Sequence, residues 1–271
     1  MCQMRHNHRR NLELKNLSDM NQREARERIE KLRNEIEEHN HRYYALNQPV
    51  ISDFEYDLLL SELVTLEKKY PEFITADSPS KVVGSDLTRE FRQVGHRYPM
   101  LSLGNTYSYD ELRDFDSRIR KSATGMVEYV CELKFDGASV SITYSGGSML
   151  NALTRGDGTK GDDVSANIKT IKSIPVNIDR KGIPDEFIVR GEVLMSKAVF
   201  ERLNKERETE GLSPFANPRN AASGTLKLLD SRTVASRGLD CKFYFLLAEK
   251  LPHSTHFGNM NEASGWGFKV P

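Results

Sequence analysis

A lysine that stands between two carboxylates is the feature of this sequence most suited to chemistry. In residues 129–137, Lys134 follows Glu132 by two positions and precedes Asp136 by two. If the run is a β-strand, its side chains alternate, so these three ionisable groups share one face. The opposite face then carries Cys131, Leu133 and Phe135. Next neighbours on one face lie about 6.5–7 Å apart, so the pattern fits a lysine nucleophile held among charges and, equally, a solvated strand of alternating charge.

Three further blocks downstream combine glycine with charged residues. Residues 154–164 are rich in glycine and aspartate, residues 189–193 contain Glu192, and residues 215–224 contain Arg219. A glycine-rich loop before a helix lets backbone N–H groups approach a phosphate closely. The same loop could be only a tight hairpin turn, so it predicts a phosphate site only in combination with the other blocks.

A second group of aromatic and acidic residues lies nearer the N-terminus. Tyr43 and Tyr44 precede an Asn-Gln-Pro break, and Asp53, Tyr56 and Asp57 follow it. Spacings of three and four residues place the last three on one helix face. Acidic residues at a helix start are favoured by the helix dipole alone. Ionised carboxylates beside tyrosine rings also suit a planar cation such as a pyridinium, and both interpretations stay open on the residues themselves.

Two capping boxes predict the helices that carry this group. Asn21 with Glu24 opens a helix that ends near residue 44, and Ser52 with Glu55 opens a second one that Pro71 stops. Apolar residues recur at helical spacing, at Ala25, Ile29, Leu32 and Ile36 in the first helix and at Leu59, Leu63, Leu66 and Tyr70 in the second. Both helices therefore have one apolar stripe, and we expect them to pair as a helical hairpin.

The rest of the chain changes from helical to strand periodicity. Ser108 and Glu111 cap a predicted helix that reaches residue 121, with Leu112, Phe115 and Ile119 on its buried stripe. Strands are predicted at residues 129–144, 150–154, 187–195 and 242–248, and helices at residues 164–171 and 197–208. These patterns predict an α+β fold with mainly antiparallel strands.

Composition excludes several classes of protein. The 271 residues suit two modules, and 38% hydrophobic and 29% charged residues exclude a chain that is disordered throughout. Lys plus Arg equal Asp plus Glu at 39 each, so no global charge attracts nucleic acid. The three cysteines are scattered, which predicts neither a disulfide framework nor a zinc site and favours a reducing cytoplasm. No apolar run is long enough for a membrane span. Residues 1–19 are typical of a disordered lead or of a misplaced start before Met20.

Taken together, the blocks around Lys134, Glu192 and Arg219 resemble the nucleotidyltransferase domain of bacterial NAD-dependent DNA ligases. The run from Tyr43 to Asp57 is similar to the family's recognition pattern for nicotinamide mononucleotide, which ATP-dependent ligases and capping enzymes lack. The resemblance implies a helical recognition module at residues 20–90. A mainly antiparallel, ATP-grasp-like adenylation domain would follow at residues 91–271, incomplete at its C-terminus.

The resemblance also implies roles for single residues. Lys134 would attack the α-phosphate of NAD to give AMP-lysine, and Asp136 would support the lysine and a metal ion. The nucleotide-binding residues would be Glu132 and Leu133 beside the adenine, Ser102 and Leu103 lining the pocket, Arg155 on the nucleotide, Glu192 on the ribose and Arg219 near the phosphate or the nick. The nicotinamide half would contact Tyr43, Tyr44, Asp53, Tyr56 and Asp57.

Lysine chemistry predicts a further requirement. At pH 7 only about one free lysine in a few thousand carries the neutral amine that attacks phosphorus. Flanking carboxylates raise the pKa of a lysine, so a bound cation or further basic groups must offset Glu132 and Asp136. Mg²⁺ on the phosphates is the natural candidate, and we expect NAD and Mg²⁺ as cofactors although no side-chain metal ligands are assigned.

Two functions follow from the family's longer organisation. The family carries two later lysine motifs and DNA-binding domains that this sequence lacks, so we expect a truncated form. It is either the adenylation part of a ligase that seals nicks in duplex DNA during repair and replication, or a fragment that binds NAD without completing adenylation. We expect a cytoplasmic monomer with no membrane partner, whose contact with nicked DNA depends on domains absent here.

Overall fold

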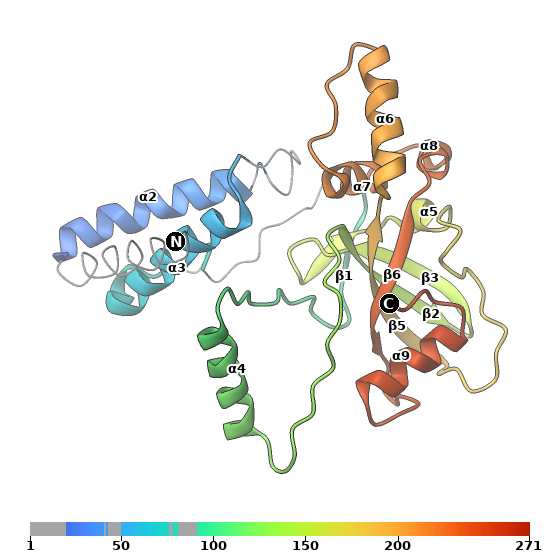
Figure 1. Ribbon diagram of the computed structural model, residues 1–271, viewed down its shortest axis with the longest axis horizontal. Coiled ribbons are helices and arrows are strands. Elements are labelled where there is room, and N and C mark those ends of the chain that lie inside the picture. Colours follow the sequence, from blue (N-terminus) through green and yellow to red (C-terminus); the bar gives the residue numbers. More distant parts are fainter. Residues whose placement is uncertain (1–19, 41, 43–49, 76–77, 81–90) are drawn as a thin grey trace. The chain divides into compact units, whose positions relative to one another are not determined.

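The computed structural model describes residues 20–40, 42, 50–75, 78–80 and 91–271, without the side chain of Asp53. The chain divides into two compact units, Met1–Asp86 and Leu87–Pro271, and each is described by itself (Figure 1). Tyr43 and Tyr44 lie outside the described residues, and so does the expected disordered lead at residues 1–19.

The first unit is a helical hairpin, as the capping boxes predict. Helix α2 spans Gln22–Asn40, helix α3 spans Asp53–Lys69, and the 3-10 helix η2 spans Pro71–Phe73. The Asn21 side chain accepts from the Glu24 amide at 3.0 Å, while Glu24 accepts from the Asn21 amide at 3.1 Å. Ser52 and Glu55 form the same reciprocal pair at the start of α3. Each box satisfies donors that a helix start leaves unpaired, which fixes where both helices begin.

The apolar stripes of α2 and α3 form the core of this hairpin. Its buried residues are Ala25, Ile29, Leu32, Ile36, Leu63, Leu66 and Tyr70. Two ion pairs join the helices beside the core, Arg28 with Glu62 and Arg33 with Glu67, each at 2.6 Å. The first pair is bidentate, a geometry that the planar guanidinium fork and a carboxylate favour. The predicted pairing of the two helices is confirmed.

Glu67 is a buried carboxylate that stays ionised in the hairpin. Its Oε1 accepts from Arg33 at 2.6 Å and from Ser78 at 2.7 Å, and its Oε2 accepts from Ser80. Burial raises the pKa of Glu67, but these hydrogen bonds outweigh burial and hold the pKa below its usual range. The group therefore acts as a structural link between α2, α3 and the chain that follows η2.

The second unit is built on a four-stranded antiparallel sheet in the order β3-β2-β5-β6. Its strands are β2 (Ala138–Ser145), β3 (Ser148–Thr154), β5 (Glu186–Leu194) and β6 (Asp240–Leu247). Gly146 and Gly147 both have positive φ and form the two-residue turn from β2 to β3, which two glycines favour. The predicted α+β fold with antiparallel strands is confirmed.

A smaller sheet and several helices surround these four strands. Strand β1 (Gln93–Gly95) pairs antiparallel with β4 (Lys160–Asp162). The helices are α4 (Tyr109–Ser122), α5 (Ser165–Ile168), α6 (Lys197–Thr209), α7 (Pro218–Leu226), α8 (Ser231–Ser236) and α9 (His256–Gly265). Helix α7 packs against β2 and β5, and α9 packs against β6 (Figure 1). These two contacts place the starts of α7 and α9 beside the sheet.

The predicted strand at residues 129–144 is wrong in its first half. Strand β2 begins only at Ala138, which pairs with Val193 of β5, and residues 126–136 are not in a strand. Cys131, Leu133 and Lys134 are all exposed, so the alternation produces no buried face. Alternation is a local pattern, whereas a strand needs a partner, and the described residues provide none before Ala138.

Helix α4 confirms its predicted cap but not its predicted buried stripe. The Ser108 hydroxyl accepts from the Glu111 amide at 3.2 Å. Leu112, Phe115 and Ile119 are 52%, 39% and 36% exposed, because the described residues place little against this face. The predicted helix at residues 164–171 is also shorter, since α5 ends at Ile168.

Candidate active site

Lys134 lies on an exposed segment, and both carboxylates that flank it are held by basic residues of other elements. Glu132 Oε1 lies 3.1 Å from Nε2 of His256, the first residue of α9. Asp136 Oδ1 lies 3.1 Å from Nε of Arg219, in the first turn of α7. The sequence requires groups that offset these carboxylates. The guanidinium of Arg219 places a positive charge beside Asp136, and the imidazole of His256 lies within hydrogen-bond distance of Glu132.

Glu192 is the most enclosed carboxylate beside this segment. It lies on β5 opposite Ser139, whose hydroxyl donates to its Oε2 at 2.7 Å, while the amide of Gly137 donates to its Oε1 at 3.2 Å. Burial raises the pKa of Glu192 above its usual range, and the bond from Ser139 opposes this rise. The positive charges of Lys134 and Arg219 also lower the pKa without cancelling the effect of burial. Lys134 and Arg219 therefore both act on one carboxylate.

Gly137 explains why the segment turns into β2 where it does. A Cβ at this position would lie 2.2 Å from the carbonyl oxygen of Val193 and 2.7 Å from the side chain of Leu194. Any larger residue would push the chain away from β5 and from Glu192. The glycine that follows Asp136 is therefore required by packing, independently of any ligand.

The position of Arg219 depends on α7, a helix that hydrogen bonds hold at both ends. The Asn217 side chain caps the helix by accepting from the Asn220 amide at 2.8 Å. At the other end, the buried Asn167 donates to the carbonyls of Leu226 at 2.7 Å and Leu228 at 2.8 Å. These bonds satisfy carbonyls that the helix end leaves unpaired and hold α7 against the sheet. Lys227 also pairs with the fully buried Asp162 of β4 at 3.3 Å.

Ser102 and Arg155, which are both predicted to bind the nucleotide, lie together. Nη1 of Arg155 lies 3.4 Å from Oγ of Ser102, and the carbonyl of Arg155 meets the His96 ring at 3.1 Å. Leu103 and Leu133 are 78% and 72% exposed, so the structure brings neither apolar side chain against the rest of the site. An apolar ligand would have open access to both.

The glycine-rich block at residues 154–164 is a hairpin turn between β3 and β4. A Cβ on Gly156 would lie 1.8 Å from the carbonyl oxygen of Lys160, and one on Gly158 would lie 2.9 Å from that of Met100. Asp157 closes the turn by accepting from the amides of Thr159 and Lys160. The turn itself therefore requires these glycines, which favours the plainer of the two interpretations. Strand β4 lies within the block, and helix α5 begins directly after it, at Ser165.

In the helical unit, the described part of the aromatic and acidic group lies at the start of α3. The Tyr56 hydroxyl donates to Oδ1 of Asn40 at 2.8 Å, and its ring packs against the hairpin core. Asp57 is half-buried on the next position. Tyr56 therefore ties the start of α3 to the end of α2. Tyr43 and Tyr44 and the side chain of Asp53 lie outside the description.

Two residues of the site carry no local sequence signal. Tyr244 of β6 is enclosed beside Glu192, and burial raises its pKa to about 12, with the charge of Glu192 adding to the rise. His256 meets Glu132 across 124 positions of sequence. Alternation along β6 assigns Tyr244 only to one face of a strand. No motif around His256 indicates that Glu132 is its partner.

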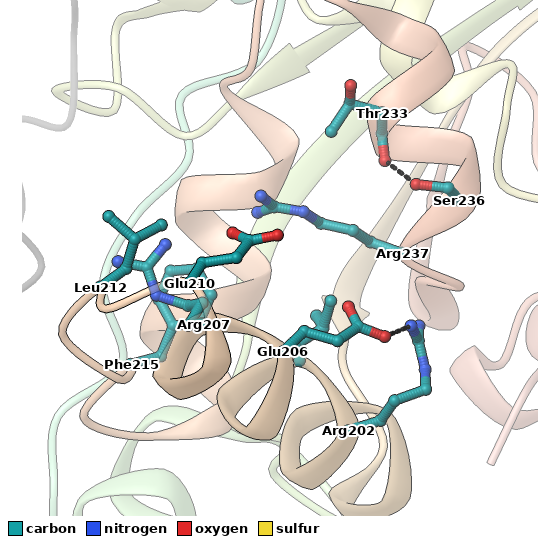
Figure 2. Close-up of a pocket in the computed structure, with 10 residues that line it drawn as sticks. Arg202, Glu206, Arg207, Glu210, Leu212, Phe215, Thr233, Ser236 and Arg237 are labelled. Atoms are coloured by element: carbon teal, nitrogen blue, oxygen red, sulfur yellow. Dashed lines mark hydrogen bonds and ion pairs between the residues drawn. The ribbon is translucent and has the colours of Figure 1, made fainter.

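One cavity among the described residues is separate from this site. It holds about 280 Å³ between α6, α8 and the loop before α7. Arg207 lies over the Phe215 ring at 4.4 Å, and Figure 2 shows Arg202 and Glu206 paired beside them. None of the predicted site residues lines this cavity, and its guanidinium groups already have partners within the fold.

The described residues contain neither a side-chain cluster for a metal ion nor a helix suited to span a membrane. No group of three or more His, Cys, Asp or Glu side chains in these parts of the chain is placed to hold a metal ion. Among the described helices, none combines the length and the apolar character that a membrane span needs.

Two known families match this sequence, one over the helical hairpin and one over the unit that contains the sheet and Lys134. Residues 22–84 match the family described as "DNA ligase-like, N-terminal NAD+-binding domain", and residues 88–271 match the "NAD-dependent DNA ligase adenylation domain". The second match covers more than half of the chain. The chain therefore belongs to the NAD-dependent DNA ligase family, which confirms the resemblance seen in the sequence.

Individual relatives agree with this assignment. The chain is 56% identical over 244 residues to the DNA ligase of Parabacteroides distasonis and 52% identical over 251 residues to that of Cytophaga hutchinsonii. It is 49% identical over 244 residues to the DNA ligase of Porphyromonas gingivalis. The alignments cover 90%, 93% and 90% of this chain but 37%, 38% and 36% of the relatives. The chain thus spans a little over a third of the curated relatives it matches.

Proposed function

We propose that the second unit transfers AMP from NAD to Lys134. The observation that carries this proposal is the pairing of both flanking carboxylates with His256 and Arg219. Because Glu132 and Asp136 have partners, the electrostatic pull of two carboxylates on the lysine amine is reduced. Lys134 is also exposed, so a ligand can reach it.

In the proposed step, Nζ of Lys134 forms a bond to the α-phosphorus of NAD. The bond from that phosphorus to the bridging oxygen breaks, and nicotinamide mononucleotide leaves with the electron pair. The lysine nitrogen loses a proton, so the product is AMP-lysine in phosphoramidate linkage. Arg219 pairs with Asp136, two positions from Lys134, and would stabilise charge that develops on the phosphate oxygens.

The remaining site residues suit the other parts of the AMP half. The Glu192 carboxylate keeps acceptor capacity beyond its two hydrogen bonds and can bind a ribose hydroxyl. Arg155 and Ser102 can hold the nucleotide from the side of β3, and Glu132 and Leu133 can meet the base. This donor set fits a nucleotide, because it combines guanidinium groups for phosphate with carboxylates for hydroxyl groups.

The helical unit would recognise the nicotinamide mononucleotide half. Tyr56 and Asp57 at the start of α3 have the aromatic and acidic character that a pyridinium ring requires. Asp53 belongs to the same first turn in the sequence, and Tyr43 and Tyr44 precede it. The family match to an NAD+-binding domain over residues 22–84 supports this assignment.

Mg²⁺ would enter with the phosphates of NAD. Mg²⁺ usually keeps several waters and binds through one or two carboxylates together with substrate phosphates. Asp136 is the carboxylate next to Lys134 with the largest exposure, at 81%, and could contribute one ligand. We expect the reaction to require the ion, although no side-chain cage for it is proposed.

The full reaction of the relatives would need more chain than is present here. A ligase that seals nicks in duplex DNA, in repair or replication, must hold the DNA as well as NAD. We propose that segments beyond the matched third of the relatives do so, that this chain acts as a monomer in the cytoplasm, and that it does not seal nicks alone.

One observation favours a second function, NAD binding without adenylation. Residues 126–134 are exposed almost throughout, so the lysine segment has few contacts to hold it at a phosphate. A loosely held nucleophile spends little time in line with phosphorus, which slows the transfer.

Intact mass spectrometry distinguishes the two functions. We expect incubation with NAD and Mg²⁺ to add the mass of one AMP to the chain, and the addition to be lost in Lys134→Ala. Lys227→Arg, which keeps the charge opposite Asp162, should retain the addition as a matched lysine control. NAD binding by calorimetry without any mass gain would instead support the second function.

A further inference from the structure

The segment that carries Lys134 has few anchors, and each comes from a different element. Tyr129 donates to Asp116 of α4, Glu132 meets His256 of α9, and Asp136 meets Arg219 of α7. Backbone pairing begins only at Ala138. The position of the lysine amine therefore depends on side-chain contacts two residues to either side.

These two contacts are not equally enclosed. The Asp136 side chain is 81% exposed, while the Glu132 and His256 side chains are 37% and 32% exposed. Exposed ion pairs contribute little, because water and salt screen them and both side chains lose freedom. The carboxylate of Glu132 is thus the more enclosed of the two that anchor the segment beside Lys134, although Arg219 itself is only 23% exposed.

His256 is itself held firmly in the fold. Thr255 caps α9 by accepting from the Gly258 amide at 3.1 Å, and the buried Asn259 donates to the carbonyls of His253 and Thr255 at 3.0 Å and 2.9 Å. The His256 ring stacks on Phe245 of β6, with centroids 5.6 Å apart and planes inclined by 31°. The imidazole is therefore fixed from its backbone and from one ring face.

The carboxylate of Glu132 determines which group donates the hydrogen bond. An ionised glutamate only accepts hydrogen bonds, so Nε2 of His256 carries the hydrogen that Glu132 receives. This fixes one nitrogen as the donor whatever the state of the other. The contact joins a rigid helix start to a segment that has no strand partner in the described residues.

We propose that His256 is a positioning residue that holds Glu132 and so places Lys134 for transfer. Its function rests on the proposed adenylation of Lys134, but its effect on the segment can be measured without NAD. No chemical step passes through the imidazole. The ring acts through Glu132, as Arg219 acts through Asp136 on the other side of the lysine.

Three variants separate the hydrogen bond from the ring. His256→Phe keeps a ring on Phe245 and loses the donor. His256→Gln keeps an N–H group at a similar reach and loses the ring. His253→Phe removes a comparable contact with Glu262, at 3.3 Å in the same part of the chain, and is the matched control.

Limited trypsin digestion of the full chain reports on the segment directly. Cleavage after Lys134 requires the segment to leave its anchors, and cleavage after the exposed Lys181 serves as an internal reference. We expect the ratio of the two rates to rise about fivefold in His256→Phe, which is the effect of one charged hydrogen bond at a partly exposed site. His256→Gln should restore most of the difference, and His253→Phe should leave it unchanged. An unchanged ratio in His256→Phe would overturn the proposal.

The adenylation rate then tests the consequence. In His256→Phe we expect the maximal rate of AMP transfer to fall about fivefold with little change in the NAD concentration at half-maximal rate, and His256→Gln to recover it. In a Glu132→Gln background, His256→Phe should have a much smaller effect, because the two residues act as one unit. If the wild-type chain gains AMP and His256→Phe gains it equally fast, the positioning role is refuted. If the wild-type chain gains none, the proposed function fails, while the trypsin ratio still decides whether His256 holds the segment.

Discussion

Two enclosed glutamates, one in each unit, have pKa values shifted in opposite directions. Glu67 in the helical hairpin accepts from Arg33 and two serines, and these bonds outweigh burial and lower its pKa. Glu192 in the sheet accepts from Ser139 and one backbone amide, and burial prevails and raises its pKa. A carboxylate with complete partners serves the fold, whereas one with spare acceptor capacity beside cationic side chains is typical of a site for ligands.

The largest expected effect comes from the close approach of the chain beside Glu192. Gly137→Ala would place a Cβ 2.2 Å from a backbone oxygen of β5, so we expect a loss of about 3 kcal/mol in the free energy of unfolding. Gly224→Ala in α7 is the matched control. No heavy atom lies within 4 Å of its added Cβ, and it should be neutral or stabilise by up to about 1 kcal/mol. Urea unfolding followed by the fluorescence of Trp266 measures both, and equal effects would show that the approach is not as close as described.

An intermediate effect is expected from the other carboxylate. Arg33→Ala leaves Glu67 without its cation, and we expect a loss of about 2–3 kcal/mol, toward the low end for a buried pair because the guanidinium is 14% exposed. Arg26→Ala removes an exposed pair with Glu30 and should cost less than about 0.5 kcal/mol. Unfolding is followed by the helical circular dichroism signal. If both variants lost the same amount, Glu67 would not be the structural link described here.

The smallest effect, and the sharpest contrast, concerns pH. The lowered pKa of Glu67 gives stability that is present above the ordinary glutamate pKa of about 4.3 and is lost as pH falls through the lower folded-state value. The raised pKa of Glu192 has the opposite sign, since the folded state favours the protonated form and gains stability as pH falls from above that raised value toward about 4.3. We expect Glu192→Gln to remove the gain in the free energy of unfolding at lower pH. We expect Glu67→Gln to remove the loss in the free energy of unfolding in acid. The fluorescence of Trp266 follows the second unit. The helical circular dichroism signal contains both units, so the part of it that the fluorescence does not follow reports on the hairpin. Shifts of the same sign in both units would contradict the comparison.

The sequence predicts the parts of both units that depend on local signals and misses the parts that depend on distant partners. The hairpin follows from local signals, because capping boxes and apolar spacing act within one helix and its neighbour. Strand β5 is likewise predicted within one residue at each end, whereas strand β2 is predicted closely only at its C-terminal end. The turn glycines at 146 and 147 also act locally, since both have positive φ in the turn from β2 to β3.

The structure of the segment that carries Lys134 could not be predicted, because it depends on distant partners. Residues 129–136 alternate like a strand, but no strand pairs with them in the described part of the chain. Glu132 finds its partner 124 positions away, and Asp136 finds its partner at the start of α7, a helix that the periodicity did not reveal. Family resemblance identified the candidate residues, and only the structure shows which side chains hold them.

A crystal structure of the chain grown with NAD and Mg²⁺ tests the central claim most directly. The account predicts continuous density from Nζ of Lys134 to a phosphorus atom, with the ribose of that AMP beside Glu192. Density for AMP joined to another lysine, or a nucleotide bound away from residue 134, would contradict it.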